Sequence, residues 1–264
     1  MKPKISIITP TKNSAATLEA SIQSVVTQKG DFYEYILVDG GSVDETLQII
    51  KRYQHVVTRW ISEPDNGIYD AMRKGIALAR GDYICFLGSD DTLCPDILHR
   101  IVSFLRDSRS IYYGNAFLSV TREVYDGPFN KYKITYDNIC QQAIFYPESV
   151  FKEFRFNERY SVGADYELNL RLFWNSPYTF EYLPFIIAKF SQRGTSAMIV
   201  DQNLNADKIQ IIRKNAPAGI RVFFYVTHYV PMVRMCSDQI LKIFQHFHEM
   251  RSKKKYVFRT PPAE

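Results

Sequence analysis

The stretch YICFLGSDDTL, residues 83–93, is an apolar run followed by Gly88-Ser89 and two adjacent carboxylates. The apolar part has the length and composition of a buried β-strand. Asp90 and Asp91 carry like charges side by side, and such charges repel each other unless a partner offsets them. The stretch therefore predicts a strand that ends where a positively charged group binds.

The residues around this stretch alternate between short apolar runs and segments with helical periodicity. We expect strands at 4–9, 33–41, 56–62 and 82–88, and helices at 14–28, 42–53, 67–79 and 94–107. Ser14 would cap the first helix, and Ser42 with Glu45 would form a capping box at the second. This alternation predicts an α/β fold with a mostly parallel central sheet flanked by helices.

The pattern becomes mixed after about residue 110. Two strands around a turn at Gly114-Asn115 are expected, and antiparallel pieces would lie beside the first sheet. Further elements are expected as strands at 143–147 and 178–191, the latter interrupted by Pro184, and as helices at 163–176, 201–214 and 218–252, the last broken at Pro231. We divide the chain into an α/β half at 1–110, a second half of the same domain at 111–200, and a helical extension at 201–264.

Ligands of open parallel sheets bind outside the carboxyl ends of the strands. The segments just past the predicted strands are polar or acidic, namely 9–13, 39–42, 63–67 and 88–91. Helix capping explains an aspartate after a strand, but it explains the pair of adjacent acids poorly. Dinucleotide binding requires a glycine-rich turn after the first strand, which residues 10–14 lack. A divalent cation that holds a diphosphate suits the pair best, because Mg²⁺ takes one or two carboxylates and completes its shell with phosphate oxygens.

Composition is that of an ordinary globular protein, with 46% apolar and 23% charged residues. The first apolar run resembles a strand more than a signal peptide, and no stretch reaches the ~20 apolar residues of a membrane span. The four cysteines have no metal-ligand spacing, which favours reduced thiols in the cytoplasm. Residues 221–264 hold eight Lys or Arg and three Asp or Glu. This basic tail predicts docking to an anionic membrane surface, or else packing on the domain, and no motif accompanies it that would indicate nucleic-acid binding.

Four ordered motifs carry a resemblance to a known family: ISIITPTKN, ILVDGGSVDET, EPDNGIYDAMRKGIALARGDYICFLGSDD and GADYELNLRL. Over residues 4–200 the chain resembles the family 2 glycosyltransferases of the GT-A fold, and most closely the bacterial enzymes that build cell-surface polysaccharides. The resemblance implies transfer of a sugar, with inversion, from a nucleoside diphosphate sugar, typically a UDP-sugar. The acceptor would be a hydroxyl of a glycan or a lipid-linked molecule, and the cofactor Mn²⁺ or Mg²⁺.

The resemblance also implies roles for the residues that match the motifs. Asp90 and Asp91 would contact the metal and the ribose, and Asp165 would be the general base. Asp39 would accept a hydrogen bond from the base of the nucleotide. The donor side would further include Thr9, Pro10, Thr11, Asn13, Asp70 and Ser89, and the acceptor side Gln142 and Arg193.

Several positions depart from the family pattern. Gly88 stands where the family often has Asp or Asn, Arg73 where it often has Asn, and Gln141 where it often has His. These departures keep an alternative open, a catalytically silent sugar-nucleotide-binding or scaffold subunit. A nucleotidyltransferase would need a glycine-rich triphosphate loop, which is missing. We expect a cytoplasmic, metal-dependent glycosyltransferase (a hexosyl- or related transferase) that is peripheral at the inner face of the membrane.

Overall fold

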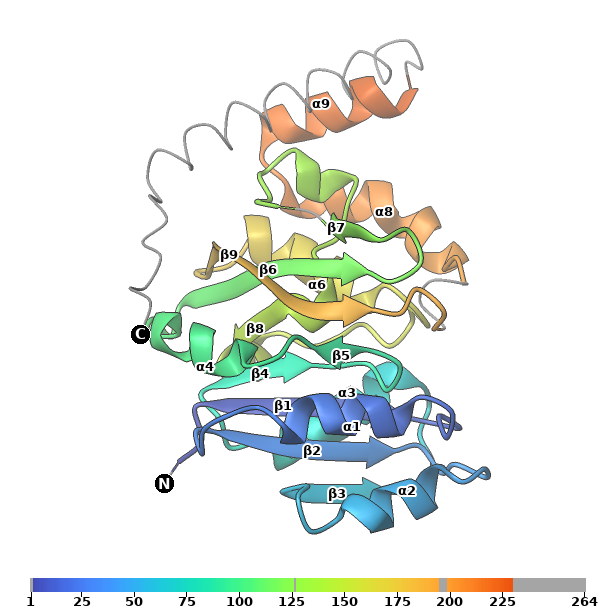
Figure 1. Ribbon diagram of the computed structural model, residues 1–264. Helices are drawn as coiled ribbons and strands as arrows, with labels where there is room; N and C mark the ends of the chain where they lie inside the picture. The colour runs from blue at the N-terminus through green and yellow to red at the C-terminus, as the bar shows by residue number, and fades with distance from the viewer. Residues whose placement is uncertain (1, 126, 195–198, 230–264) are drawn as a thin grey trace.

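A mixed sheet of nine strands runs through the part of the chain that the structure describes (Figure 1). The structure is a computed structural model, and it describes residues 2–125, 127–194 and 199–229. The strand order is β3-β2-β1-β4-β8-β6-β9-β5, and β7 pairs with β6. The strands are β1 (Ile5–Thr11), β2 (Tyr33–Asp39), β3 (Arg59–Ser62), β4 (Tyr83–Phe86), β5 (Thr92–Leu93), β6 (Ser110–Leu118), β7 (Glu123–Tyr125), β8 (Ile144–Pro147) and β9 (Thr179–Phe190). The helices are α1 (Leu18–Val26), α2 (Thr46–Tyr53), α3 (Ile68–Leu78), α4 (Ile97–Ile101), α5 (Val150–Glu153), α6 (Ala164–Trp174), α8 (Gln202–Asn215) and α9 (Ala218–Tyr229).

The N-terminal part of the sheet is parallel, as the alternation predicts. β1 lies between β2 and β4, and β3 extends the sheet beyond β2, all in parallel register. Every residue of β1 is buried, because helices cover both faces. One apolar cluster joins the sheet to α1, α2 and α4, and a second joins the opposite face to α3 and α6. The carboxyl ends of the parallel strands therefore share one edge, to the right in Figure 1.

The second half differs from the expectation at Gly114. Strand β6 continues through Gly114-Asn115, where a turn was predicted, and pairs with β9 in parallel register. The register between these strands shifts at Asn115, which marks a bulge. A Cβ on Gly114 would lie 2.7 Å from Ile187 Cγ1 and 2.7 Å from the Phe185 carbonyl oxygen. The glycine therefore permits the close approach of β9, and Pro184 lies in the same irregular stretch without ending the strand.

The predicted helix caps at Ser14 and Ser42 are wrong. Helix α1 begins at Leu18, and the Ser14 hydroxyl instead contacts the Ser89 hydroxyl at 2.8 Å. Helix α2 begins at Thr46, whose amide donates to Asp44 Oδ1 at 3.0 Å, and the Ser42 hydroxyl donates to Asp39 instead of capping the helix. Both serines serve the polar edge of the sheet rather than a helix. The helix predicted at 94–107 is also shorter, ending at Ile101 before a 3₁₀ turn.

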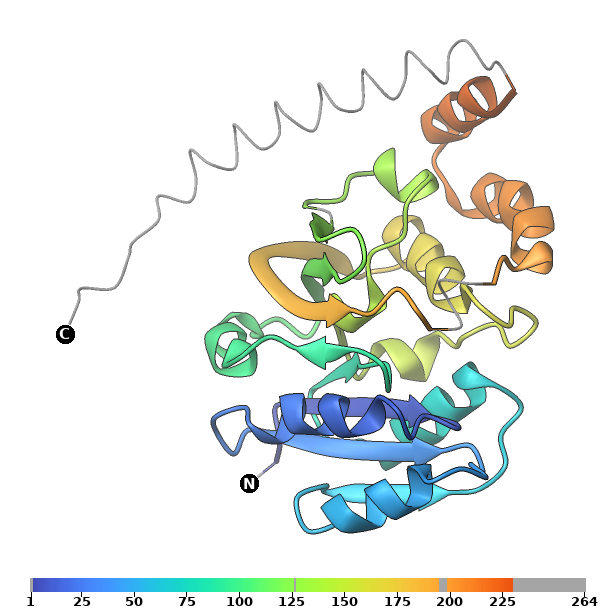
Figure 2. The ribbon, with the colours of Figure 1, turned by 45° about the vertical axis from the view of Figure 1, so that its right-hand side comes forward.

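The C-terminal helices α8 and α9 lie at the opposite end of the molecule from β3 (Figure 2). Ile220 and Phe224 of α9 are buried in a small cluster with Ile212 of α8. The part of the predicted basic tail that the structure describes is thus packed on the domain, and the continuation of the helix to 252 lies outside the described residues. Within the described ranges, no helix combines the length and apolar character needed to cross a bilayer.

Candidate active site

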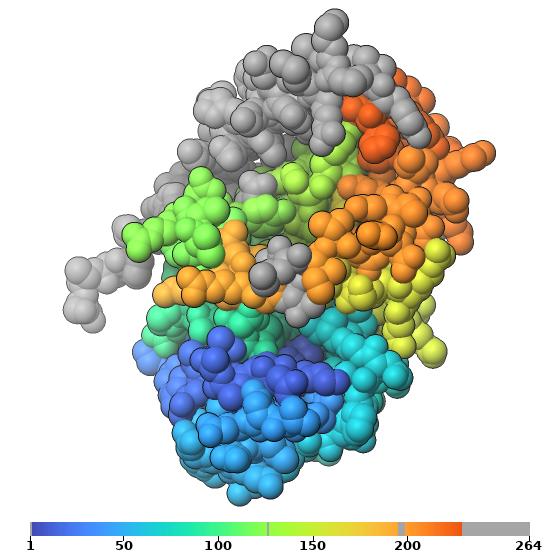
Figure 3. All heavy atoms as spheres, turned by 90° about the vertical axis from the view of Figure 1, so that its right-hand side faces the viewer, coloured from blue at the N-terminus to red at the C-terminus, as the bar shows by residue number. Residues whose placement is uncertain are grey.

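A large open cleft of about 1380 Å³ lies at the carboxyl ends of the strands. Its walls come from both halves of the chain: residues 10–17 and 88–91 on one side, and residues 138–142, 161–166 and 190–194 on the other. Figure 3 looks onto this edge, with the N-terminal residues in blue below and the orange residues after β9 above. A cavity that both halves line thus lies where the strand ends predict a ligand site.

Asp90 and Asp91 lie at the bottom of this cleft. Asp91 is 5% exposed, and its Oδ1 accepts a hydrogen bond of 2.8 Å from the Ser191 amide. The Ser191 hydroxyl donates to Asp90. Burial and the neighbouring charge of Asp90 raise the pKa of Asp91 to about 7. A cation between the two carboxylates would remove this penalty, because it favours the ionised forms.

Gly88 lets the carboxylates of this pair pack closely against the backbone. A Cβ on Gly88 would lie 2.6 Å from Asp91 Oδ2 and 3.0 Å from Asp90 Oδ1. Within the described residues no cluster of three or more His, Cys, Asp or Glu could hold a metal. Two carboxylates side by side on the wall of the cleft suit a cation that takes its remaining ligands from phosphate and water.

We expect Gly88→Ala to weaken metal-dependent donor binding by about tenfold or more, because its methyl group would push the Asp91 carboxylate aside. Isothermal titration of the nucleotide in the presence of Mn²⁺ measures this. Gly219→Ala is the matched control, since a Cβ there meets nothing within 4 Å. Unchanged affinity in Gly88→Ala would show that donor binding does not depend on the position of the Asp91 carboxylate.

Asp165 faces the same cleft from the first turn of α6. The helix begins after Gly163, whose φ of 83° is a conformation that glycine adopts without strain. The Tyr69 hydroxyl donates to Asp165 Oδ1 at 2.8 Å, and Asn138 Nδ2 donates to Oδ2 at 2.6 Å. Burial raises the pKa of Asp165, and these two hydrogen bonds oppose the shift. The result is a buried carboxylate with fixed orientation, which suits a general base.

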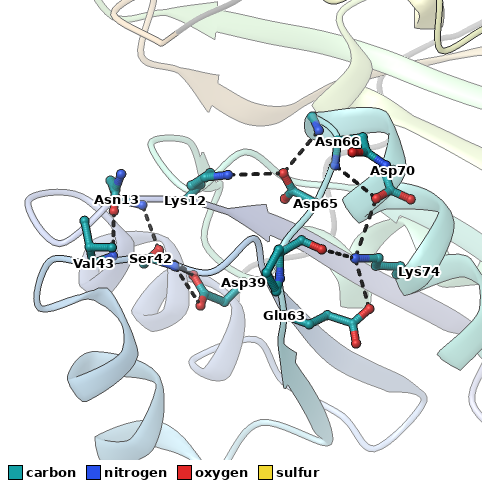
Figure 4. Close-up of polar contacts among 12 residues, drawn as sticks. Lys12, Asn13, Asp39, Ser42, Val43, Glu63, Asp65, Asn66, Asp70 and Lys74 are labelled. Carbon is teal, nitrogen blue, oxygen red and sulfur yellow. Dashed lines mark hydrogen bonds and ion pairs between the residues drawn. The ribbon is translucent and has the colours of Figure 1, made fainter.

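The polar edge beyond β1 and β2 is tied together by hydrogen bonds (Figure 4). Asp39 is fully buried, and its oxygens accept from the Ser42 amide at 3.2 and 3.3 Å and from the Ser62 hydroxyl at 2.6 Å. The Asn13 amide donates to Ser42 Oγ at 2.8 Å, and Asn13 Oδ1 accepts from the Val43 amide at 2.9 Å. Asp39 thus supports the loops on either side of it.

Lys74 of α3 holds the loop between β3 and α3. Its ammonium group contacts Glu63 at 2.9 Å, the Pro64 carbonyl at 2.7 Å and Asp70 at 3.6 Å (Figure 4). The loop carries Asp65, whose carboxylate lies 3.5 Å from Lys12 Nζ at the cleft wall. The contacts of Lys74 thus hold the loop so that Asp65 pairs with Lys12 at the end of the cleft nearest to β1 and β2.

The structure brings most of the predicted site residues together. Those that line the cleft are Pro10, Thr11, Asn13, Ser89, Asp90, Asp91, Gln142, Asp165 and Arg193. Thr9, Asp39 and Asp70 lie behind the wall rather than in it. Thr11 Oγ1 and Gln142 Nε2 are buried and have no hydrogen-bond partner among the described residues.

Sequence reasoning missed four lining residues with a part in the site: Lys12, Asp65, Tyr69 and Asn138. Lys12 and Asp65 lie within segments already recognised as strand ends, so position alone could have marked them. The sequence around Tyr69 is that of a core residue on a helix, which gives no indication of a site. Nothing in the sequence around Asn138 marks it as a site residue. Arg73, one of the departures from the family pattern, pairs with Asp70 and lies 3.4 Å from Glu158.

Solved structures of low sequence identity share this fold. The chain matches TarS residues 1–349 of S. aureus, solved with UDP, with a TM-score of 0.68 and 18% identity over 86% of this chain and 72% of that one. It also matches the mannosyltransferase PcManGT of Pyrobaculum calidifontis, solved with GDP-Man and Mn²⁺, with a TM-score of 0.63 and 17% identity over 87% and 70% of the two chains. The molecule has the GT-A fold, as predicted.

Sequence comparisons give the family. The Glycosyl transferase family 2 profile matches residues 6–157. The PGL/p-HBAD biosynthesis glycosyltransferase of Mycobacterium bovis BCG is 35% identical over 88% of this chain and 92% of its own length. The putative teichuronic acid biosynthesis glycosyltransferase TuaG of Bacillus subtilis is 30% identical over 54% and 59% of the two chains. This chain belongs to glycosyl transferase family 2.

Proposed function

We propose that this protein transfers a sugar, with inversion, from a nucleoside diphosphate sugar to a hydroxyl of its acceptor. The observation that carries the proposal is the placement of Asp165 and the Asp90-Asp91 pair in one cleft. Cys140, which also lines the cleft, interacts with both acidic centres, because burial and the charges of Asp91 and Asp165 raise the pKa of its thiol.

Asp165 is the proposed general base. Inversion requires that the acceptor oxygen attack the anomeric carbon from the side opposite the departing diphosphate. A carboxylate that takes the proton from that oxygen accelerates such a step by about 10²–10⁴-fold. Asp165 is buried and held by two donors, so its free lone pairs point to a defined place in the cleft. In this scheme residues 1–110 bind the donor and residues 111–200 supply the base and bind the acceptor, with Gln142 and Arg193 on the acceptor side.

Asp90 and Asp91 are the proposed holders of a divalent cation, Mn²⁺ or Mg²⁺. Their adjacency, the raised pKa of Asp91 and their shared place on the cleft wall all suit an ion of this kind. When bound, the ion would neutralise the negative charge that develops on the departing diphosphate. Ser191 holds both carboxylates in place through its amide and hydroxyl groups.

The donor proposed here is a UDP-sugar. TarS, which shares the fold, has been solved with UDP and with UDP-GlcNAc, whereas PcManGT has been solved with GDP-Man. Asp39 is the proposed partner of the nucleotide base, with Pro10, Thr11 and Asn13 around it. Since Asp39 already accepts hydrogen bonds from Ser42 and Ser62, base binding would exchange at least one of them.

The acceptor proposed here is a glycan or a lipid-linked molecule in the synthesis of cell-surface polysaccharides. The relatives from Mycobacterium bovis and Bacillus subtilis are named for PGL/p-HBAD and teichuronic acid biosynthesis, which are cell-surface products. A lipid-linked acceptor would require the protein to work at a membrane surface. Val222 and Val226 on α9, in the described part of the basic tail, are 62% and 43% exposed and present apolar side chains one turn apart.

A panel of nucleotide sugars tests the function. The full chain is incubated with each donor, Mn²⁺ or Mg²⁺ and membrane extract as acceptor, and release of the nucleoside diphosphate is measured. One donor should be turned over in a metal-dependent way and protect the protein against thermal unfolding. A donor that binds but is never turned over, with any acceptor, would favour the alternative of a silent binding or scaffold subunit.

Deletion of residues 230–264 should release the protein from membranes. The cut falls after α9, because removing residues from 221 onward would also remove Phe224 from its buried cluster. Each Lys or Arg near an anionic surface contributes about 1 kcal/mol, and salt screens the attraction. Sedimentation with phosphatidylserine vesicles should show binding of the full chain that the deletion abolishes. Replacing Lys253, Lys254 and Lys255 by Gln is the milder variant, and equal sedimentation of all three proteins would contradict membrane docking.

A further inference from the structure

Asp165 is the end of a buried chain of hydrogen bonds that begins on the central sheet. The Tyr146 hydroxyl on β8 donates to Asn169 Oδ1 at 2.9 Å, and Asn169 Nδ2 donates to Asn138 Oδ1 at 2.9 Å. Asn138 Nδ2 then donates to Asp165 Oδ2 at 2.6 Å. We call Tyr146, Asn169 and Asn138 the hydrogen-bond chain. Tyr146 and Asn169 are fully buried.

The direction of this chain follows from chemistry. An ionised carboxylate only accepts hydrogen bonds, so Asn138 must turn its nitrogen toward Asp165 and its oxygen toward Asn169. An inverted Asn138 would place its oxygen against the carboxylate. The carboxylate thus fixes Asn138, and Asn138 Oδ1 in turn fixes Asn169, whose nitrogen must face it. Asn169 Oδ1 is left to accept from the Tyr146 hydroxyl, which supplies the last donor of the chain.

Tyr69 donates to the other carboxylate oxygen from the opposite wall. Its hydroxyl lies 2.8 Å from Asp165 Oδ1, on the first turn of α3. The Tyr69 ring packs against Phe156, with 5.1 Å between ring centroids, which limits its movement. Asp165 therefore receives one side-chain donor on each oxygen, and each donor is itself held by packing or by a further hydrogen bond.

We propose that the hydrogen-bond chain and Tyr69 are positioning residues, which orient Asp165 and keep it ionised in a buried site. The inference rests on the proposed function, since it assumes that Asp165 is the base. Burial raises the pKa of Asp165, and hydrogen bonds from Tyr69 and Asn138 lower it. No ion pair of the described residues involves Asp165. Neutral hydrogen-bond donors, rather than a neighbouring cation, therefore stabilise its negative charge.

The other titratable groups that face Asp165 do not supply charge. Tyr69 from α3, Tyr146 from β8 and Cys140 from the segment before β8 interact with it, and burial raises the pKa of all three. They remain neutral across the pH range of an activity measurement. Asp91 in the same cleft has a pKa raised to about 7, so saturating Mn²⁺ is kept in every assay to hold it ionised. A shift of the acid limb in the tyrosine variants then reports on Asp165.

Hydroxyl-only variants test the proposal. Tyr69→Phe and Tyr146→Phe remove a donor and keep the ring, and Tyr113→Phe is the matched control, a buried tyrosine of the same apolar cluster whose hydroxyl accepts from the Phe129 amide. Transfer is measured from pH 5 to 9 with the donor identified in the panel. Loss of one hydrogen bond to a carboxylate should move the acid limb of kcat upward by about one pH unit for Tyr69→Phe and by about half a unit for Tyr146→Phe.

The pH profile separates positioning from simple damage. On the acid limb of the profile kcat should fall by about 3- to 10-fold with the KM of the donor unchanged, and most of it should return on the alkaline side of that limb, where Asp165 ionises again. Equal losses at every pH, or the same shift in Tyr113→Phe, would overturn the proposal. A second measurement needs no substrate: the ¹³C signal of the Asp165 carboxyl, assigned by its absence in Asp165→Asn, should titrate at higher pH in both variants.

The proposed function and this inference fail in different ways. Full transfer by Asp165→Asn would overturn the role of Asp165 as base. An inactive Asp165→Asn beside wild-type pH profiles in Tyr69→Phe and Tyr146→Phe would leave the base in place and overturn the positioning role of its donors.

Discussion

Asp165→Asn should lower sugar transfer by about 10²–10⁴-fold and leave the dissociation constant of the donor unchanged. An amide cannot take a proton from the acceptor hydroxyl, so only the chemical step is lost. The replacement fits the site, because the new amide nitrogen can donate to the Tyr69 hydroxyl while its oxygen accepts from Asn138. The loss should therefore not come from unfolding.

Release of nucleoside diphosphate and calorimetric donor binding measure the two effects separately. Asp207→Asn is the matched control, because Asp207 pairs with Arg159 at 3.1 Å and does not line the cleft. Asp165→Asn that binds donor as wild type but transfers nothing is the expected pattern. Simultaneous loss of donor binding would place Asp165 on the donor side instead.

Asp91→Asn should abolish the dependence of donor binding on Mn²⁺, with donor affinity falling at least to that of the wild type in EDTA. A neutral amide is a weaker ligand for a hard divalent cation than a carboxylate is. Calorimetric titration of the nucleotide with Mn²⁺ and with EDTA measures the effect. Asp96→Asn, at a surface pair with Lys29, is the control.

In the absence of metal, Asp91→Asn should stabilise the folded protein at high pH. In EDTA the folded protein holds Asp91 with a raised pKa, so ionising it costs free energy that the unfolded chain does not bear. This cost begins above the unfolded pKa near 3.8 and is complete above about pH 7. Asp91→Asn should therefore melt at a higher temperature than the wild type at pH 8, with the difference shrinking toward pH 4. A lower melting temperature at pH 8 would mean that Asp91 stabilises the metal-free fold.

The parallel part of the fold was predictable because its signals are local. Each strand from β1 to β4 is an apolar run that ends in polar residues, and the alternation of strands with helices leaves few other ways to bury both faces of the sheet. The position of the cleft followed from the same pattern, since parallel strands end at one edge. Asp90, Asp91 and Asn13 could be placed there before the structure was known.

What could not be predicted depends on contacts between distant residues. Tyr69 and Asp165 are 96 positions apart, and a tyrosine in an apolar helix face has the same local signal as any core residue. Gly114-Asn115 has the local signal of a turn, yet the approach of β9 makes it a bulge. Ser42 has the signal of a helix cap, yet its hydroxyl goes to Asp39. In each case a partner from elsewhere in the chain decides the outcome.

Strand β4, which precedes Asp90 and Asp91, pairs with β1 and with β8, and β8 is synthesised well after β4. On the edge of β4 away from β1, Tyr83 pairs with Pro147 and Ile84 with Tyr146, so this edge stays unpaired until β8 has been synthesised. A nascent chain that has emerged only to residue 110 would carry an apolar strand with an open edge, which invites pairing with other chains. Chains stalled or cleaved before β8 should consequently aggregate, and the protein should depend on chaperones that shield β4 during translation.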